Sequence, residues 1–190
     1  MTTLSQKKGP IFIVGSARSG TTLLQRMLRS HPRISSPTGE STFIIPLYRN
    51  ATAFGDLNKI ENVRCVLQEM HRINSNYLET DFYWQRFDID TLSREFHAEG
   101  RNSIPKVIAG IFEKNTRLEG KMRWLDKSPY YILHLRTILE IFPDAKIIHI
   151  IRDGRDCALS MLVRKYDLKI FNTYTAAKIW QQYVDIGQKT

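Results

Sequence analysis

The sequence is poor in the residues that hold many small proteins together through disulfides or metals. It contains two cysteines, Cys65 and Cys157, and they form no Cys-x-x-Cys pair. Its five histidines show no metal-binding spacing of the His-Glu-x-x-His kind. These absences argue against a disulfide framework and against a zinc site of a familiar pattern. We therefore expect no bound metal.

Long hydrophobic runs are also lacking. No apolar stretch approaches the roughly 20 residues that span a bilayer, and residues 1–10 are polar where a signal peptide would be apolar. We expect a cytoplasmic protein without a membrane span. With 190 residues and 42% hydrophobic content, the chain fits one domain, since domains usually have about 100 to 200 residues. We expect residues 1–190 to be that domain.

Acidic residues are outnumbered: there are 19 Asp and Glu against 28 Lys and Arg, which gives a net charge of +9. This excess predicts attraction to anions, including nucleic acids, acidic membranes and phosphorylated small molecules. The basic residues are scattered and match no nucleic-acid-binding motif, so we expect no nucleic-acid partner. A non-catalytic module that binds anions or nucleic acid remains an alternative.

The apolar pattern predicts strands that alternate with helices. Strands are expected at 11–14, 123–127 and 146–151. Helices are expected from Thr21, around 60–70 and 104–112, at 132–141, and from 153 and 173. In the first helix, Leu23, Leu24, Met27 and Leu28 form the expected apolar face, and Gln25, Arg26 and Arg29 the polar one. The alternation predicts an α/β fold with a P-loop-type parallel β-sheet flanked by helices on both faces.

A glycine- and hydroxyl-rich loop follows the first strand. Gly15 and Gly20 have the P-loop spacing, which lets backbone N–H groups converge on a phosphate. Nucleotide hydrolases continue with a lysine, whereas Thr21 and Thr22 follow here and Arg18 lies within the loop. Two hydroxyls and a guanidinium suit a phosphosulfate. The loop alone leaves a P-loop kinase or nucleotide hydrolase, or simply a threonine-capped helix, as alternatives.

A second candidate anion site follows the strand at 146–151. Arg152 stands at the strand end and Ser160 eight positions later, and ligands bind at strand ends in open parallel sheets. The guanidinium and the hydroxyl can bind one phosphate together. A nucleotide with phosphates at both ends would need two such sites. The alternative is that residues 152–156 form exposed ion pairs of little energetic value.

These motifs carry a family resemblance. The loop at 15–22 resembles the 5′-phosphosulfate loop of sulfotransferases, and residues 151–155 with Ser160 resemble their 3′-phosphate motif. The order of motifs is similar to that of the tyrosylprotein sulfotransferases. The matching segments are Arg-Ser-Gly-Thr-Thr-Leu from Arg18, His-Pro at 31–32, Gly-Glu at 39–40, Lys-x-Pro at 127–129 and Arg-Asp-Gly-Arg at 152–155. The resemblance spans about 11–166, and the middle third is unmatched.

The resemblance implies a donor and a set of roles. The donor is 3′-phosphoadenosine-5′-phosphosulfate, used without a metal. The residues implied to bind its phosphosulfate are Arg18, Ser19, Gly20, Thr21 and Thr22, and those implied for its 3′-phosphate are Arg152 and Ser160. Because the family continues beyond a helix like that at 173–190, we expect a domain that lacks the C-terminal part of the family fold, either as a fragment or as a shortened member.

The resemblance also implies catalytic residues. Glu40 would be the general base, since a hydroxyl is a poor nucleophile at neutral pH. Lys127 would contact the bridging oxygen and, together with Arg18, stabilise the leaving phosphate. The alternatives are a helix-capping role for Glu40 and a surface position for Lys127. The acceptor would be a hydroxyl of a small molecule, carbohydrate or peptide, bound by the unmatched middle third or also by residues beyond 190.

Overall fold

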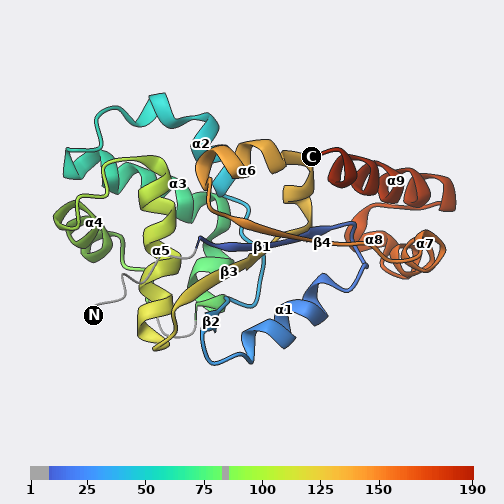
Figure 1. The fold of residues 1–190 in the computed structure, drawn as a ribbon. Coiled ribbons are helices and arrows are strands. Elements are labelled where there is room, and N and C mark those ends of the chain that lie inside the picture. Colours follow the sequence, from blue (N-terminus) through green and yellow to red (C-terminus); the bar gives the residue numbers. More distant parts are fainter. Residues whose placement is uncertain (1–8, 83–85) are drawn as a thin grey trace.

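The computed structural model describes residues 9–82 and 86–190. Within them, four parallel strands form a sheet in the order β2-β3-β1-β4 (Figure 1). The strands are β1 (Ile11–Gly15), β2 (Ile34–Ser35), β3 (Arg123–Lys127) and β4 (Lys146–Ile150). The expected strands are confirmed, except that β4 ends one residue early and β2 was not predicted. Because all four run in one direction, their carboxyl ends meet at one edge of the sheet.

Helices cover both faces of the sheet, as predicted. Phe12 and Val14 of β1 point into the main core, while Ile11 and Ile13 point to the other face, where α1 (Thr21–Arg29) packs. This alternation is the two-residue period of a strand. The main core is closed by α2 (Ile44–Arg49), α3 (Ile60–Asn76), α4 (Ile89–Ala98), α5 (Ile104–Leu118) and α6 (Leu135–Ile141).

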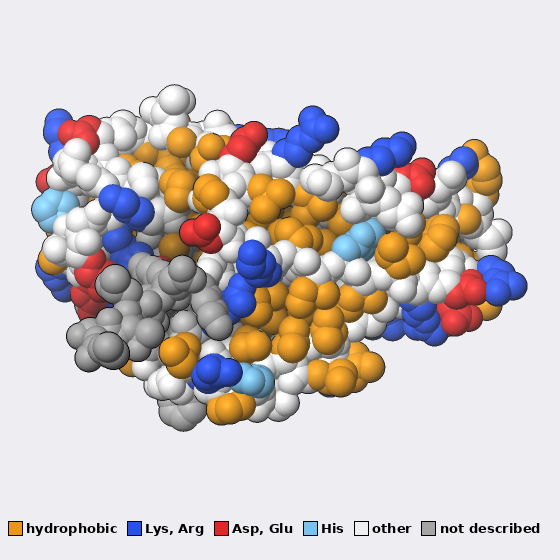
Figure 2. All heavy atoms as spheres, in the orientation of Figure 1, with side chains coloured by type: hydrophobic (Ala, Val, Ile, Leu, Met, Phe, Trp, Pro, Cys, Tyr) orange, Lys and Arg blue, Asp and Glu red, His pale blue; other side chains and the backbone are white. Residues whose placement is uncertain are grey.

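The expected faces of α1 are confirmed in part: Leu24 and Leu28 pack on the sheet and Arg26 is exposed, but three residues differ. Leu23 and Met27 are 66% and 62% exposed, whereas Gln25 is buried. The Gln25 amide donates to the Ser36 hydroxyl at 3.1 Å and to the Pro37 carbonyl at 2.6 Å. A buried polar group needs such partners, and these bonds tie α1 to the segment that leads to Glu40. Hydrophobic side chains gather on the visible face where Figure 1 places β4 and α1 (Figure 2).

The middle third is largely helical, as expected for α3 and α5, but α2 and α4 were not predicted. The helix expected at 132–141 is α-helical only from Leu135, because a 3₁₀ helix occupies Pro129–His134. In the aromatic stretch at 77–87, Tyr77 and Phe82 are buried and meet edge to face. These two rings are core packing; Tyr83 and Trp84 lie outside the described residues. Two short elements complete this part, a 3₁₀ helix at Ala51–Phe54 and a π-helical turn at Tyr77–Asp81.

The C-terminal helices form a lobe beyond β4, on the right in Figure 1. They are α7 (Gly154–Val163), α8 (Lys165–Leu168) and α9 (Thr173–Lys189). A small separate core around Cys157 and Met161 joins them. Across the described residues, no helix combines the length and apolarity needed to cross a bilayer.

Candidate active site at the carboxyl edge of the sheet

The loop after β1 has the geometry of an anion-binding turn. A Cβ on Gly15 would lie 2.5 Å from the Ile150 carbonyl oxygen of β4, so only glycine fits at this position of β1. Arg18 has φ 67° and Gly20 φ 99°. For an arginine this left-handed backbone is uncommon, and such strain concentrates at functional sites. A Cβ on Gly20 would meet nothing within 4 Å, so the space over the loop is open.

The first amides of α1 follow directly after Gly20. The first N–H groups of a helix have no intrahelical acceptor, and no side chain caps α1. Thr22 is exposed, whereas Thr21 and Ser19 are each 5% exposed. The Ser19 hydroxyl lies 3.6 Å from the Cys157 sulfur of α7. In this arrangement the backbone N–H groups and Thr22 are better placed for an anion than the Ser19 side chain.

The second predicted anion site lies against the first. Arg18 Nε donates to the Ser160 hydroxyl at 3.0 Å, and an Arg152 amino group donates to the Arg18 carbonyl at 3.3 Å. Arg18 of the loop is thus in contact with both predicted residues of the second motif. The ion pairs of the alternative interpretation also form: Arg152 contacts Asp156 at 3.2 Å and Arg155 contacts Asp153 at 2.7 Å. Arg152 therefore contacts the loop through Arg18 and also forms an ion pair with Asp156.

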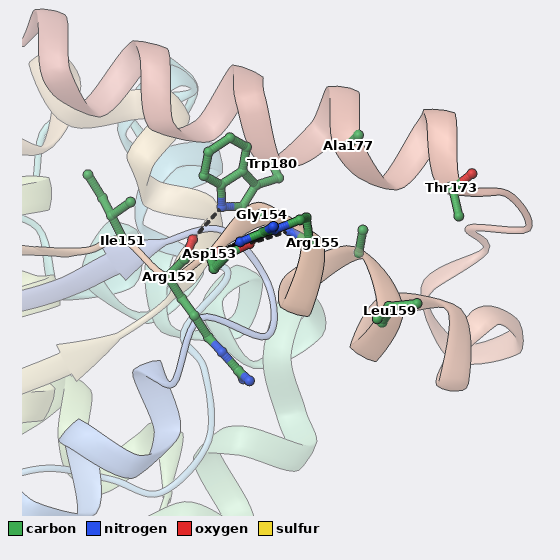
Figure 3. Close-up of a pocket in the computed structure, with 10 residues that line it drawn as sticks. Ile151, Arg152, Asp153, Gly154, Arg155, Leu159, Thr173, Ala177 and Trp180 are labelled. Atoms are coloured by element: carbon green, nitrogen blue, oxygen red, sulfur yellow. Dashed lines mark hydrogen bonds and ion pairs between the residues drawn. The ribbon is translucent and has the colours of Figure 1, made fainter.

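A pocket of about 850 Å³ lies on the other side of Arg152, between α7 and α9 (Figure 3). The Trp180 indole N–H donates to the Arg152 carbonyl at 2.9 Å, while the guanidinium points away from Trp180. A Cβ on Gly154 would lie 2.8 Å from the Trp180 ring, so glycine permits this close approach. Hydrogen bonds from Arg155 hold the pKa of Asp153, the N-cap of α7, below its usual range. Trp180 of α9 thus holds the backbone of Arg152 through its hydrogen bond to the Arg152 carbonyl.

Glu40 and Lys127 form an ion pair at the carboxyl end of β3. The Lys127 side chain is 4% exposed and that of Glu40 47%. Lys127 is therefore not a surface lysine. Glu40 does not cap a helix either, because α2 begins four residues later with Phe43 as its N-cap. The structure brings the predicted base and the predicted cation into direct contact, with the carboxylate facing solvent.

A buried acid beside this pair was not predicted from the sequence. Asp126 is 1% exposed and accepts hydrogen bonds from Ser41 at 2.7 Å and Tyr77 at 3.1 Å. Burial raises its pKa to about 6, although these bonds and Lys127 act in the opposite direction. The available signal was an aspartate inside the apolar strand Arg-Trp-Leu-Asp-Lys.

No three His, Cys, Asp or Glu side chains cluster as a candidate metal site within 9–82 and 86–190. The expectation of a metal-free reaction stays a prediction.

The fold and the edge of the sheet define an α/β protein of the P-loop-like class. A model of the sulfotransferase family matches residues 10–189, and the chain belongs to that family. It is 30% identical over 163 residues to protein-tyrosine sulfotransferase A of Caenorhabditis elegans, and 29% identical over 162 residues to protein-tyrosine sulfotransferase 1 of Danio rerio. Each match covers 85% of this chain but only 35% and 38% of those relatives.

Solved structures show the same fold. The sulfotransferase domain of the Synechococcus PCC 7002 olefin synthase aligns with a TM-score of 0.54 and 24% identity, over 97% of this chain and 64% of that one. The sulfotransferase domain from the curacin biosynthetic pathway aligns with a TM-score of 0.55 and 23% identity, over 97% and 63%. The predicted fold class is thereby confirmed.

Proposed function

We propose that this chain is an enzyme that transfers a sulfuryl group from 3′-phosphoadenosine-5′-phosphosulfate to a hydroxyl. One observation carries the proposal: the loop, Arg152 and Ser160 meet at the same edge of the sheet that holds the Glu40–Lys127 pair. Membership of the sulfotransferase family supports it. Sulfuryl transfer from this donor needs two anion-binding sites, one for each phosphorylated end, and a base near them for the acceptor hydroxyl.

The donor would be held at both of its phosphorylated ends. The loop amides and Thr22 suit the 5′-phosphosulfate, because helix N-termini favour anions. Arg152 and Ser160 suit the 3′-phosphate, and they already lie together through their contacts with Arg18. A phosphate could accept hydrogen bonds from both. Charge-assisted bonds of this kind are stronger than neutral ones, so the site favours nucleotides with a 3′-phosphate.

Glu40 would take the proton of the acceptor hydroxyl as its oxygen attacks sulfur. The new oxygen–sulfur bond forms as the bond from sulfur to the 5′-phosphate oxygen breaks, and its electron pair leaves with the phosphate. Lys127 and Arg18 would stabilise this charge, and losing one such donor costs on the order of a hundredfold in rate. Burial of Lys127 strengthens its effect because water screens it less.

A P-loop kinase or nucleotide hydrolase is the rival that shares the loop. The lysine of those enzymes is absent after Gly20, and Thr21 stands in its place. Calorimetry separates the two proposals. We expect 3′,5′-adenosine bisphosphate to bind in the presence of a chelator. Binding of ATP that requires magnesium, without binding of the bisphosphate, would refute the sulfotransferase.

The acceptor class can be tested on the same protein. Curated relatives of this chain are named as protein-tyrosine sulfotransferases, so we infer that a tyrosine hydroxyl in a peptide is the first acceptor to examine. Radiolabelled donor would be supplied with tyrosine peptides, with the same peptides carrying phenylalanine, and with small phenols and sugars. Label in the tyrosine peptides alone supports this acceptor, and label in sugars alone contradicts it.

A further inference from the structure

The segment that carries Glu40 is fastened to the end of β3 through the next residue, Ser41. The Ser41 hydroxyl donates to Asp126 at 2.7 Å, and the Ser41 carbonyl accepts from the Ser128 hydroxyl at 2.7 Å. All three residues are buried. Glu40 itself is bonded to Lys127. Two successive residues of one segment are thus bonded to three successive residues of β3 and the turn after it.

The hydroxyls around Asp126 form a directed chain. Ser41 has one proton to donate and gives it to Asp126, so its oxygen must accept from the Tyr131 hydroxyl at 2.9 Å. The Tyr131 oxygen is in turn hydrogen-bonded to the Ile44 backbone, where the amide is the donor. Tyr77 donates to the second carboxylate oxygen at 3.1 Å. Every donor in this chain points toward Asp126, an arrangement that requires a carboxylate at its end.

We propose that Asp126 is a positioning residue of the sulfotransferase reaction, which orients Glu40 on Lys127 through its hydrogen bond to Ser41. The inference rests on the proposed function. Neighbouring residues of a strand point to opposite faces, so Asp126 lies in the core while Lys127 serves the site. Asp126 touches no reacting atom and acts only on the segment that carries the base.

The groups that face Asp126 make its effect dependent on pH. Burial dominates and raises the pKa to about 6; the bonds from Ser41 and Tyr77 and the charge of Lys127 lower it, and Glu40 raises it. Tyr131 also faces the carboxylate. Below this pH Asp126 is protonated and becomes a donor itself, so it no longer offers Ser41 a carboxylate that only accepts. We therefore expect a loss of transfer rate as the pH falls through about 6.

Two variants are compared, because each deletes one hydroxyl and one hydrogen bond to the same carboxylate; Ser41→Ala also removes the partner of the Tyr131 hydroxyl. Ser41→Ala breaks the link to the Glu40 segment, whereas Tyr77→Phe leaves that link and keeps the ring that packs against Gly39. We expect Ser41→Ala to lower kcat by about a hundredfold, the scale of a misplaced catalytic group. The Kd for 3′,5′-adenosine bisphosphate should not change. Tyr77→Phe should keep kcat at neutral pH. Because the bond from Tyr77 lowers the pKa of Asp126, its loss should move the acid limb of the pH–rate profile to higher pH.

Equal losses of kcat in the two variants, or an acid limb that Tyr77→Phe leaves in place, would overturn the positioning role. Crystal structures of both variants give a readout that needs no activity. The Glu40–Lys127 pair should open in Ser41→Ala and stay closed in Tyr77→Phe, and a pair that is closed in both contradicts the inference. Wild-type protein that neither binds the bisphosphate nor transfers sulfate would instead refute the proposed function, and the crystallographic comparison would still decide whether the bond between Ser41 and Asp126 orients Glu40 on Lys127.

Discussion

Replacing Asp126 by asparagine should change how the stability of the fold depends on pH. A carboxyl whose pKa is raised from 3.8 to about 6 keeps its proton in the folded state at pH values where the unfolded chain has lost it. Stability therefore falls as the pH rises through this window. At about 1.4 kcal/mol per pH unit, the ionised carboxylate costs the wild type about 3 kcal/mol above pH 6, and nothing below pH 3.8.

Asparagine has the same shape but does not ionise, so the variant lacks this component. It also loses one acceptor, which costs about 1 kcal/mol at every pH. We expect the free energy of unfolding of Asp126→Asn, relative to wild type, to rise by about 3 kcal/mol between about pH 4 and about pH 7. Other carboxylates are common to both proteins and cancel in the difference.

Urea unfolding followed by tryptophan fluorescence, at a series of pH values, measures this difference directly. A difference that stays constant with pH would show that Asp126 titrates as an ordinary carboxyl. The reasoning from its burial would then be wrong. A rise of the expected size would show that the protein keeps a buried charge at a cost in stability, as expected for a group retained for catalysis.

Three further substitutions test the site and its support. Ser160→Ala should weaken binding of 3′,5′-adenosine bisphosphate roughly 10- to 100-fold, the worth of one charged hydrogen bond, and leave 5′-AMP binding unchanged in calorimetry; equal losses for both ligands would place Ser160 elsewhere. Gly154→Ala should lower the free energy of unfolding by about 1 to 3 kcal/mol, because the new methyl group meets Trp180; an unchanged urea midpoint would contradict this. Gln25→Ala should cost about 1 to 3 kcal/mol because it removes both hydrogen bonds of a buried amide, whereas Arg26→Ala, on the exposed face, should cost little in the same assay.

The local features of the fold could be predicted because they depend on short sequence patterns. The apolar run of β1, the glycine spacing of the loop and the helical periodicity of α3 and α5 each act within a few residues. The burial of Gln25 in α1 could not be predicted, since its partner is a turn that forms only in the folded chain. The helix α4 had a usable signal, because Asp88 precedes its apolar positions and caps it at the Thr91 amide.

In the candidate site, too, short motifs could be predicted, whereas contacts between distant segments could not. Motifs identified Arg18, Glu40, Lys127, Arg152 and Ser160, but they did not predict the direct contacts of Arg18 with Ser160 and of Glu40 with Lys127. Contact between Arg18 and Ser160 joins residues 142 positions apart, and it depends on the parallel register of β1 and β4. The role of Ser41 and Asp126 was not predicted, because the buried partners of an acid in a strand come from other elements of the fold.

The measurement that tests the account most directly is sulfate transfer by Glu40→Gln. Glutamine can still accept a hydrogen bond from Lys127 but cannot take the acceptor proton. The variant should bind 3′,5′-adenosine bisphosphate as the wild type does and transfer radiolabelled sulfate at least about a hundredfold more slowly. Glu140→Gln, which alters an exposed glutamate of α6, should transfer at the wild-type rate. Undiminished transfer by Glu40→Gln would contradict the assignment of Glu40 as the base.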